Sequence, residues 1–150
     1  MHTPTLIDPS SLGIHFFFEG IDLQLPEEQL SLWIQSVLQK EQKRLQSIRF
    51  IFCQDDFLHQ INVAYLNHDT LTDVITFPYA DSEDVIDGEI YISIDRIKEN
   101  AKMYQVAMMQ ELYRIMVHGV LHLCGYDDKE ENSKKRMSEK EDLYLESLLL

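Results

Sequence analysis

Residues 111–128, ELYRIMVHGVLHLCGYDD, constrain the fold of this chain more than any other segment. Their apolar residues recur at the spacing of an α-helix, and Gly125 marks the position where such a helix ends. His118 and His122 are four residues apart, so on a helix they lie one above the other on the same face. Two imidazole rings held in this way can bind one metal ion. The segment therefore predicts a mostly apolar helix that carries a metal site.

Asp128 is the candidate for a third ligand. A glycine in the left-handed conformation reverses the chain, so Asp128 can return over the face that carries the two histidines. An alternative is that Asp127 or Asp128 caps the next helix, with Glu131 completing a capping box. The two aspartates could also divide these tasks between them.

The helix face that carries His118 and His122 also carries Glu111 and Arg114. Cys124 lies far round the helix from His118, so we expect it to belong to the core and not to the metal site. A simpler interpretation of the whole pattern is two histidines that lie one turn apart in a core helix. The glycine and the acidic residues that follow favour a metal.

A site with three protein ligands predicts hydrolytic chemistry. It leaves the fourth position of Zn²⁺ to a water molecule, whose pKa falls to about 7 so that it becomes a nucleophile. In H-E-x-x-H proteases, the glutamate after the first histidine is the general base. Gly119 occupies that position here, so a protease mechanism lacks its base.

Length and composition indicate a single domain over residues 1–150. The chain has 150 residues and 45% hydrophobic residues, which suits one domain with a substantial core. It has no apolar run long enough for a transmembrane helix, and residues 1–13 lack the pattern of a secretory signal. Cys53 and Cys124 are too few for a disulfide framework and predict reduced thiols in the cytoplasm.

The charge is strongly acidic, with a formal net charge of −13, which repels nucleic acid at long range. The basic residues gather in two groups: Lys40, Lys43, Arg44 and Arg49, and then Lys134, Lys135 and Arg136. Taken alone, each group is expected to be a solvated helix face.

Hydrophobic periodicity predicts an α+β domain with one small sheet of about four strands. The strands are expected at residues 13–18, 48–53, 72–77 and 89–94. Helices are expected at residues 26–45 and about 55–67, from Asp95 to Gly125 with a weak break near 104–106, and from near 128–133 onward. We expect His15 to be a sheet residue, and Trp33 and Cys53 to be core residues.

Three blocks of this sequence resemble the YbeY family of bacterial endoribonucleases and rRNA maturation factors. Residues 118–128, HGVLHLCGYDD, are similar to the family signature H-G-x-L-H-L-x-G-Y-D-H. Asn62, Tyr65 and residues 72–78, TDVITFP, resemble the family's L-N-x-x-Y-R and P-T-D-V-L-S-F-P. Residues 88–90 resemble its G-D-I. The blocks occur in the family's order, and the length matches over nearly the whole chain.

Met137 and Glu141 also stand where the last helix of the family carries Met and Glu. The resemblance implies a small mixed β-sheet packed with helices, and one zinc ion bound by His118, His122 and Asp128 at the HGxLH helix. It implies hydrolysis of single-stranded RNA in small-subunit rRNA 3′-end maturation and ribosome quality control. The implied partners are an rRNA precursor and the small ribosomal subunit or its assembly factors, with no DNA and no membrane.

The sequence departs from the family pattern at three positions. Asp128 replaces the histidine that is the family's third ligand, and a carboxylate is a harder ligand that zinc still accepts. Leu66 replaces an arginine, which would hold a phosphate or stabilise the charge of a transition state. Arg114 is a candidate for that role on helical spacing alone. Leu71 replaces a proline in a loop.

Two other functions remain as alternatives. One is a zinc hydrolase that acts on another substrate, such as a peptide, and the missing glutamate at position 119 counts against it. The other is a non-catalytic ribosome assembly factor with a structural metal. An open coordination position would count against the second, because structural zinc sites are closed.

Overall fold

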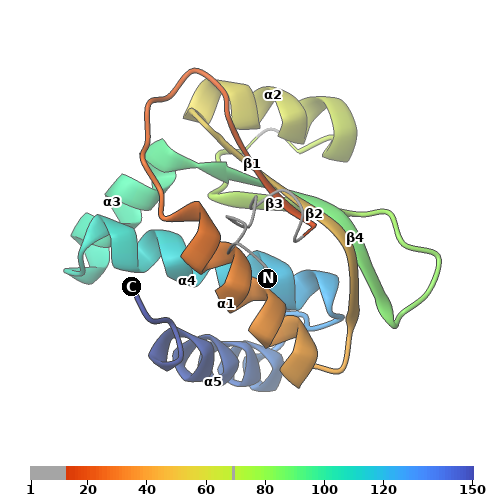
Figure 1. The fold of residues 1–150 in the computed structure, drawn as a ribbon. Coiled ribbons are helices and arrows are strands. Elements are labelled where there is room, and N and C mark those ends of the chain that lie inside the picture. Colours follow the sequence, from red (N-terminus) through yellow and green to blue (C-terminus); the bar gives the residue numbers. More distant parts are fainter. Residues whose placement is uncertain (1–12, 69) are drawn as a thin grey trace, which may run out of the picture.

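The computed structural model describes residues 13–68 and 70–150. Within this part of the chain, four strands and five helices form one α+β domain, as predicted (Figure 1). In chain order they are β1 Ile14–Phe18, α1 Glu27–Lys40, β2 Arg44–Cys53, α2 Asp55–Leu66, β3 Val74–Pro78, β4 Val85–Ser93, α3 Ile94–Tyr104, α4 Met108–Leu123 and α5 Glu131–Glu146. The prediction that no secretory signal is present concerns N-terminal residues, of which 1–12 lie outside the described ranges.

The sheet has the strand order β1-β2-β4-β3. Strands β1, β2 and β4 are parallel, with Phe16 opposite Phe50 and Phe50 opposite Ile90. Strand β3 is antiparallel to β4, with Thr76 opposite Ile90. The sheet is therefore mixed, as the family resemblance implies.

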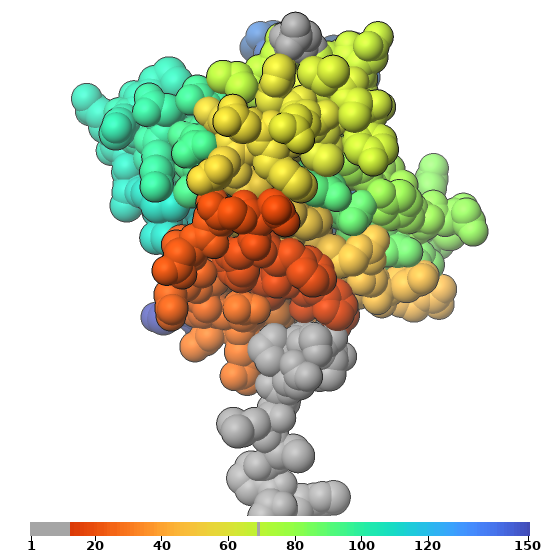
Figure 2. Space-filling view, turned by 90° about the horizontal axis from the view of Figure 1, so that it is seen from above, coloured from red at the N-terminus to blue at the C-terminus, as the bar shows by residue number. Residues whose placement is uncertain are grey.

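Helices form two layers on one side of the sheet and one on the other (Figure 1). Helices α1 and α4 pack against one face, α5 lies beyond them, and α2 covers part of the opposite face. Seen from above, α2 and β1 form much of that opposite surface, between α3 on one side and the β3–β4 loop on the other (Figure 2). In the described ranges, no helix is long and apolar enough to cross a membrane.

Alternation along the strands explains the main core. In β2, Ile48, Phe50 and Phe52 are fully buried and point to the α1–α4 side. Trp33 of α1 joins them, and its indole N–H donates to the carbonyl of Tyr144, 2.8 Å away. A smaller cluster beneath α2 contains Cys53, Leu58 and Ile75. The predicted burial of Trp33 and Cys53 is confirmed.

Helix α4 approaches β4 very closely at Gly119. A Cβ atom at this position would lie 2.8 Å from Cγ2 of Ile90, which is itself fully buried. The neighbouring positions of α4 are filled by apolar residues with little or no exposure: Leu112, Met116, Val117, Val120 and Leu121. The position that holds a glutamate in H-E-x-x-H proteases therefore faces the sheet here and has no room for a side chain.

Four predicted boundaries are wrong, including the start of β2, which was expected at residue 48. The helix expected to reach residue 45 ends at Lys40, where the chain turns through Gln42 at a positive φ of 59°, and β2 begins at Arg44. Leu45 fits the helical spacing of α1, but it also alternates with the apolar residues of β2, and the sheet pairing prevails.

The other two differences concern β3 and β4. Strand β3 begins at Val74, two residues later than expected, and β4 begins at Val85 rather than at Glu89. Gly88 lies inside β4 and not before it. A Cβ atom at this position would come within 2.8 Å of the Phe77 carbonyl oxygen, which explains why the residue is a glycine. Helix α3 begins at Ile94, one residue before the expected Asp95, and is capped by Ser93, whose hydroxyl accepts from the backbone N–H of Arg96.

The predicted break between α3 and α4 is confirmed. Helix α3 ends at Tyr104, Gln105 adopts a left-handed φ of 57°, and α4 begins at Met108. The last helix begins at Glu131, within the predicted range. His15 lies in β1, as expected.

The close contact at Gly119 can be tested by a double-mutant cycle. Gly119→Val should lower the free energy of unfolding by about 1–3 kcal/mol, because overpacking outweighs the small gain in helix propensity. Ile90→Ala opens space beside this position and should itself be destabilising. In urea unfolding, the Gly119→Val/Ile90→Ala protein should lose less free energy of unfolding than the sum of the losses of the two single variants. Additive losses would mean that the two positions do not touch.

Candidate metal centre

Helix α4 presents His118 and His122 on one flank, about 60° to 100° round the helix from Gly119, which packs against the sheet. This flank borders a cleft of about 440 Å³, which is also lined by Glu111, Arg114 and Asp128. The prediction that the histidines share a helix face with Glu111 and Arg114 agrees with this arrangement. His118 is 16% exposed at its side chain and His122 is 26% exposed, so both rings are held firmly but remain accessible.

A Schellman turn ends α4 and reverses the chain. The N–H of Gly125 donates to the carbonyl of His122, and the N–H of Tyr126 donates to the carbonyl of Leu121, both at 3.0 Å. Gly125 has a φ of 105°, which an L-residue with a side chain rarely adopts. This reversal carries Asp128 back over the histidines.

The two aspartates after the turn have different tasks. Oδ1 of Asp127 accepts a hydrogen bond from the backbone N–H of Lys129. The N-cap residue of α5 is Glu130, and no side chain caps it. The alternative in which Asp128 and Glu131 form a capping box is therefore wrong, and the Asp128 carboxylate is available to the histidines.

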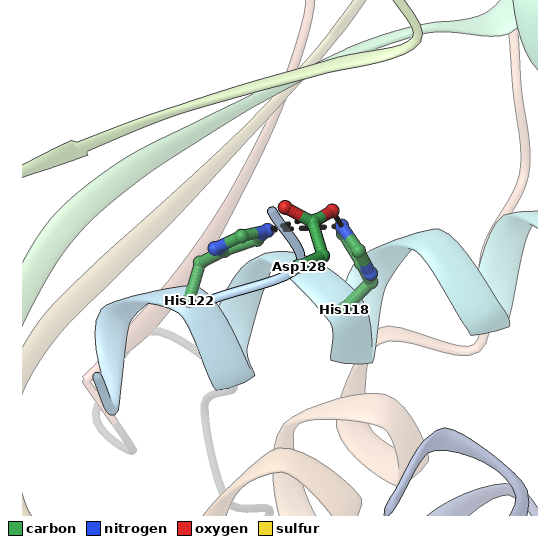
Figure 3. A group of neighbouring side chains, drawn as sticks. All are labelled: His118, His122 and Asp128. Carbon is green, nitrogen blue, oxygen red and sulfur yellow. Dashed lines mark hydrogen bonds and ion pairs between the residues drawn. The ribbon is translucent and has the colours of Figure 1, made fainter. Parts of the chain in front are cut away.

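Figure 3 shows the Asp128 carboxylate between the two imidazole rings. The two Nε2 atoms lie 3.0 Å apart. Oδ2 of Asp128 lies 3.4 Å from Nε2 of His118 and 3.5 Å from Nε2 of His122. A tetrahedral zinc with bonds of about 2.0–2.1 Å places its ligand atoms about 3.3 Å apart. The three residues thus fit a tetrahedral ion, and they could hold one.

Glu141 of α5 fixes the orientation of His118. Its Oε2 lies 2.6 Å from Nδ1 of His118, and its Oε1 accepts a hydrogen bond of 2.9 Å from Arg114. A carboxylate in this position keeps the proton on Nδ1 and directs the lone pair of Nε2 toward a metal. Glu141 is only 6% exposed, so its charge depends on these two partners.

The surroundings shift the two histidines in opposite directions. Burial lowers the pKa of His118, but the hydrogen bond and charge of Glu141 outweigh this effect and leave that pKa raised. Burial, together with the charge of His118, lowers the pKa of His122. A proton therefore competes with a metal ion more strongly at His118 than at His122.

The cleft beside the histidines is acidic. Burial raises the pKa of Glu111, and the nearby charge of Asp73 adds to this shift. Arg114 and Lys134 are the cations that line the cleft in the described ranges. Arg114 is held by Glu141 and by Asp142, whose Oδ1 accepts from Nη2 at 2.6 Å. Binding of a phosphate group in this acidic cleft would therefore need additional positive charge, such as that of a metal ion.

Two other predicted positions lie apart from the triad. Leu66 ends α2 and lines a different pocket, together with Asn62. Cys124 is partly buried against the core, and burial raises the pKa of its thiol to about 12. Its expected exclusion from the metal site agrees with the grouping of His118, His122 and Asp128.

Sequence reasoning did not assign roles to Glu141 and Lys134. Glu141 is 23 residues from His118, so no local spacing connects them, and the only sequence signal was a matching position in the family's last helix. Lys134 belongs to a basic group that is exposed to solvent, as expected, and it also lines the cleft.

Comparison with known proteins gives the family. The family model described as Endoribonuclease YbeY matches residues 17–149. The chain belongs to the YbeY family. Membership of this family identifies it as an endoribonuclease, a hydrolase of phosphodiester bonds.

Relatives within the YbeY family are similar over most of their length. Endoribonuclease YbeY of Amoebophilus asiaticus is 50% identical over 134 residues, which are 89% of this chain and 91% of the relative. The Flavobacterium psychrophilum protein of the same name is 49% identical over 86% of this chain and 91% of its own. The solution structure of TM1509 from Thermotoga maritima has a TM-score of 0.65 and 30% identity, with 90% of this chain and 88% of that chain covered.

The role of Glu141 in this YbeY-family chain can be measured by metal affinity. Glu141→Gln should weaken metal binding by about 10–100-fold in a chelator competition, because Nδ1 of His118 loses its carboxylate partner. Asp142→Asn is the matched control, since it also removes one charge and one partner of Arg114 but does not touch His118. Equal affinities for the two variants would contradict the assigned role of Glu141.

Proposed function

We propose that this endoribonuclease is zinc-dependent and specific for single-stranded RNA, and that it acts in small-subunit rRNA 3′-end maturation and ribosome quality control. The observation that carries the proposal is the convergence of His118, His122 and Asp128 at the edge of an open cleft. We place this activity in the cytoplasm, on RNA and not on DNA, and with the small ribosomal subunit or its assembly factors as partner.

The donor set suits zinc. Two neutral imidazoles and one carboxylate are common zinc ligands, and three protein ligands leave one position open. A zinc ion held there would supply a water molecule acidified for attack on phosphorus. The 3.0–3.5 Å spacing of the three ligand atoms supports this assignment.

The protein's own side chains position the reaction. Glu141 orients His118, and Asp128 adds one negative charge opposite the two rings. We assign Arg114 the phosphate contact that the family's arginine would make. It uses one N–H toward Glu141 and one toward Asp142, so further donors of its five remain for a phosphate oxygen. Its side chain is 29% exposed.

The structure bears on the two alternatives. A peptide hydrolase of the H-E-x-x-H type needs a base at position 119, but Gly119 is packed against Ile90. A purely structural metal would be enclosed by its ligands, whereas the Asp128 side chain is 42% exposed and borders the cleft. Both observations favour the endoribonuclease over these alternatives.

Metal analysis combined with an RNA assay tests the proposal. The purified protein should contain about one zinc ion per chain, because the three protein ligands form one site. It should also cleave single-stranded RNA. His118→Ala and Asp128→Ala should each lose most of the bound metal and of the cleavage, because each removes a ligand. A wild-type protein without metal would refute the catalytic assignment, and full occupancy in Asp128→Ala would refute the third ligand.

A ligand exchange separates metal ligation by the Asp128 side chain from the effect of its charge. Asp128→His should keep the metal and the activity, because it supplies the histidine of the family signature. Asp128→Asn has a similar size but is a poor zinc ligand, so it should lose metal. Metal content and initial cleavage rates of the two variants, compared at equal protein stability, give the answer. Full metal content in Asp128→Asn would show that position 128 is not a ligand.

A further inference from the structure

A second hollow lies on the other side of the loop that carries Asp128. We call it the Tyr126 groove. It has a volume of about 390 Å³ and is lined by Glu41, Lys43, Cys124, Gly125, Tyr126, Asp127, Ser133 and Arg136. Asp127 borders this groove, while its neighbour Asp128 borders the metal cleft. The two hollows therefore begin one residue apart.

Helix α5 separates the two hollows and contributes to both. Ser133 and Arg136 line the Tyr126 groove, whereas Lys134 and Ser138 line the metal cleft. A strand that lies in the cleft can therefore continue across the first turns of α5 and enter the groove.

The folded chain brings together the two basic groups that are far apart in sequence. Glu41, at the end of α1, joins α5 and the loop before Asp128, since its carboxylate accepts hydrogen bonds from the hydroxyls of Tyr126 and Tyr144 and from Nζ of Lys140. Lys43 is thereby placed at the same groove as Arg136. The expectation that each group is only a solvated face does not describe this arrangement.

The groove is lined by two cations, Lys43 and Arg136, and by the carboxylates of Glu41 and Asp127, and neither cation is paired with a carboxylate of the described residues. Nζ of Lys43 donates to the main-chain carbonyl of Glu83, 2.7 Å away, so it keeps its full charge. The guanidinium of Arg136 lies 5.2 Å from the centre of the Tyr126 ring and forms no ion pair with any residue in the described ranges. The Glu41 carboxylate is already occupied by Lys140 and two tyrosine hydroxyls.

The geometry of these cations suits phosphate. A guanidinium that stacks on an aromatic ring is held flat and still presents its N–H groups at the edge, where they match two phosphate oxygens. The Tyr126 ring is itself fixed, because its hydroxyl donates to Glu41 at 2.7 Å. The two carboxylates of the groove already have partners, since Glu41 accepts from Lys140 and Tyr126, and Asp127 accepts from the backbone N–H of Lys129. In a chain with a net charge of −13, two cations without a carboxylate partner, next to a metal cleft, can therefore attract a polyanion locally.

We propose that the Tyr126 groove binds the phosphodiester backbone of the single-stranded RNA that extends from the metal cleft, with Lys43 and Arg136 each contacting a phosphate. This inference rests on the proposed function and extends it, because it specifies where the substrate lies outside the cleavage site. It also predicts that substrates too short to reach the groove do not use these two residues.

The salt dependence of RNA binding tests the groove. The metal-loaded protein is titrated with a fluorescent, 2′-O-methylated single strand between about 50 and 200 mM salt, and the affinity is followed by anisotropy. Lys43→Ala and Arg136→Ala should each reduce the slope of log K against log salt by about 0.7, and the double variant by about 1.4. Arg136→Lys should keep the slope, since it keeps the charge.

Lys98→Ala is the matched control. Lys98 is exposed on α3, lines neither hollow, and its loss changes the net charge by the same amount. Its slope should equal that of the wild type. If Lys43→Ala and Arg136→Ala behave like Lys98→Ala while the wild type still cleaves RNA, the groove proposal is overturned and the proposed function stands. If the wild type neither binds nor cleaves RNA, both are overturned.

Discussion

The contact between α4 and β4 determines where the candidate metal centre lies. Gly119 lets the helix approach Ile90 so closely that a side chain would not fit between them. Successive helix residues are rotated by about 100°, so His118 and His122 both lie about 60° to 100° round from Gly119 on the same side. Fixing Gly119 against the sheet therefore turns both imidazoles toward Asp128, and His118 also lines the cleft. The same contact removes the position from which a protease-type glutamate would act.

Helix α5 belongs to the centre although it provides no ligand. Glu141 is a buried carboxylate, and burial of a charge is costly unless partners compensate it. His118 and Arg114 supply that compensation, so the orientation of the first histidine and the placement of α5 depend on each other. Glu41 acts similarly on the other side of the loop, where it holds Tyr126 through its hydroxyl. Glu141 thus connects α5 to α4, and Glu41 connects the end of α1 to the loop that carries Asp128.

The parts of the site that follow from local chain geometry could be predicted from the sequence. A spacing of four on a helix and a glycine reversal are sufficient to bring His118, His122 and Asp128 together, and the structure places their ligand atoms 3.0–3.5 Å apart. Glu141 could not be derived in this way, because its contact with His118 arises only when α5 packs on α4.

The fold shows the same division between local and tertiary effects. The four strands and the break at Gln105 follow from periodicity and from residues that disfavour helix. The end of α1 was misplaced because Leu45 satisfies a helical and an alternating pattern equally, and only pairing with Ile86 of β4 decides between them. Gly88 was taken as the residue before a strand, whereas its role is the close approach of the Phe77 carbonyl and of Leu123.

An acidic endoribonuclease must reconcile repulsion at long range with attraction at the site. At physiological ionic strength the Debye length is about 8 Å, so distant carboxylates act weakly on a bound strand, while cations in contact with it act strongly. Arg114, Lys134, Lys43 and Arg136 line the two hollows on either side of the Asp128 loop, and a divalent metal would add to them. The remaining surface, with a net charge of −13 for the whole chain, slows the approach of free RNA. The proposed delivery of the substrate by a ribosomal partner would bypass this slow approach, because RNA already held near the Asp128 loop would contact these cations directly.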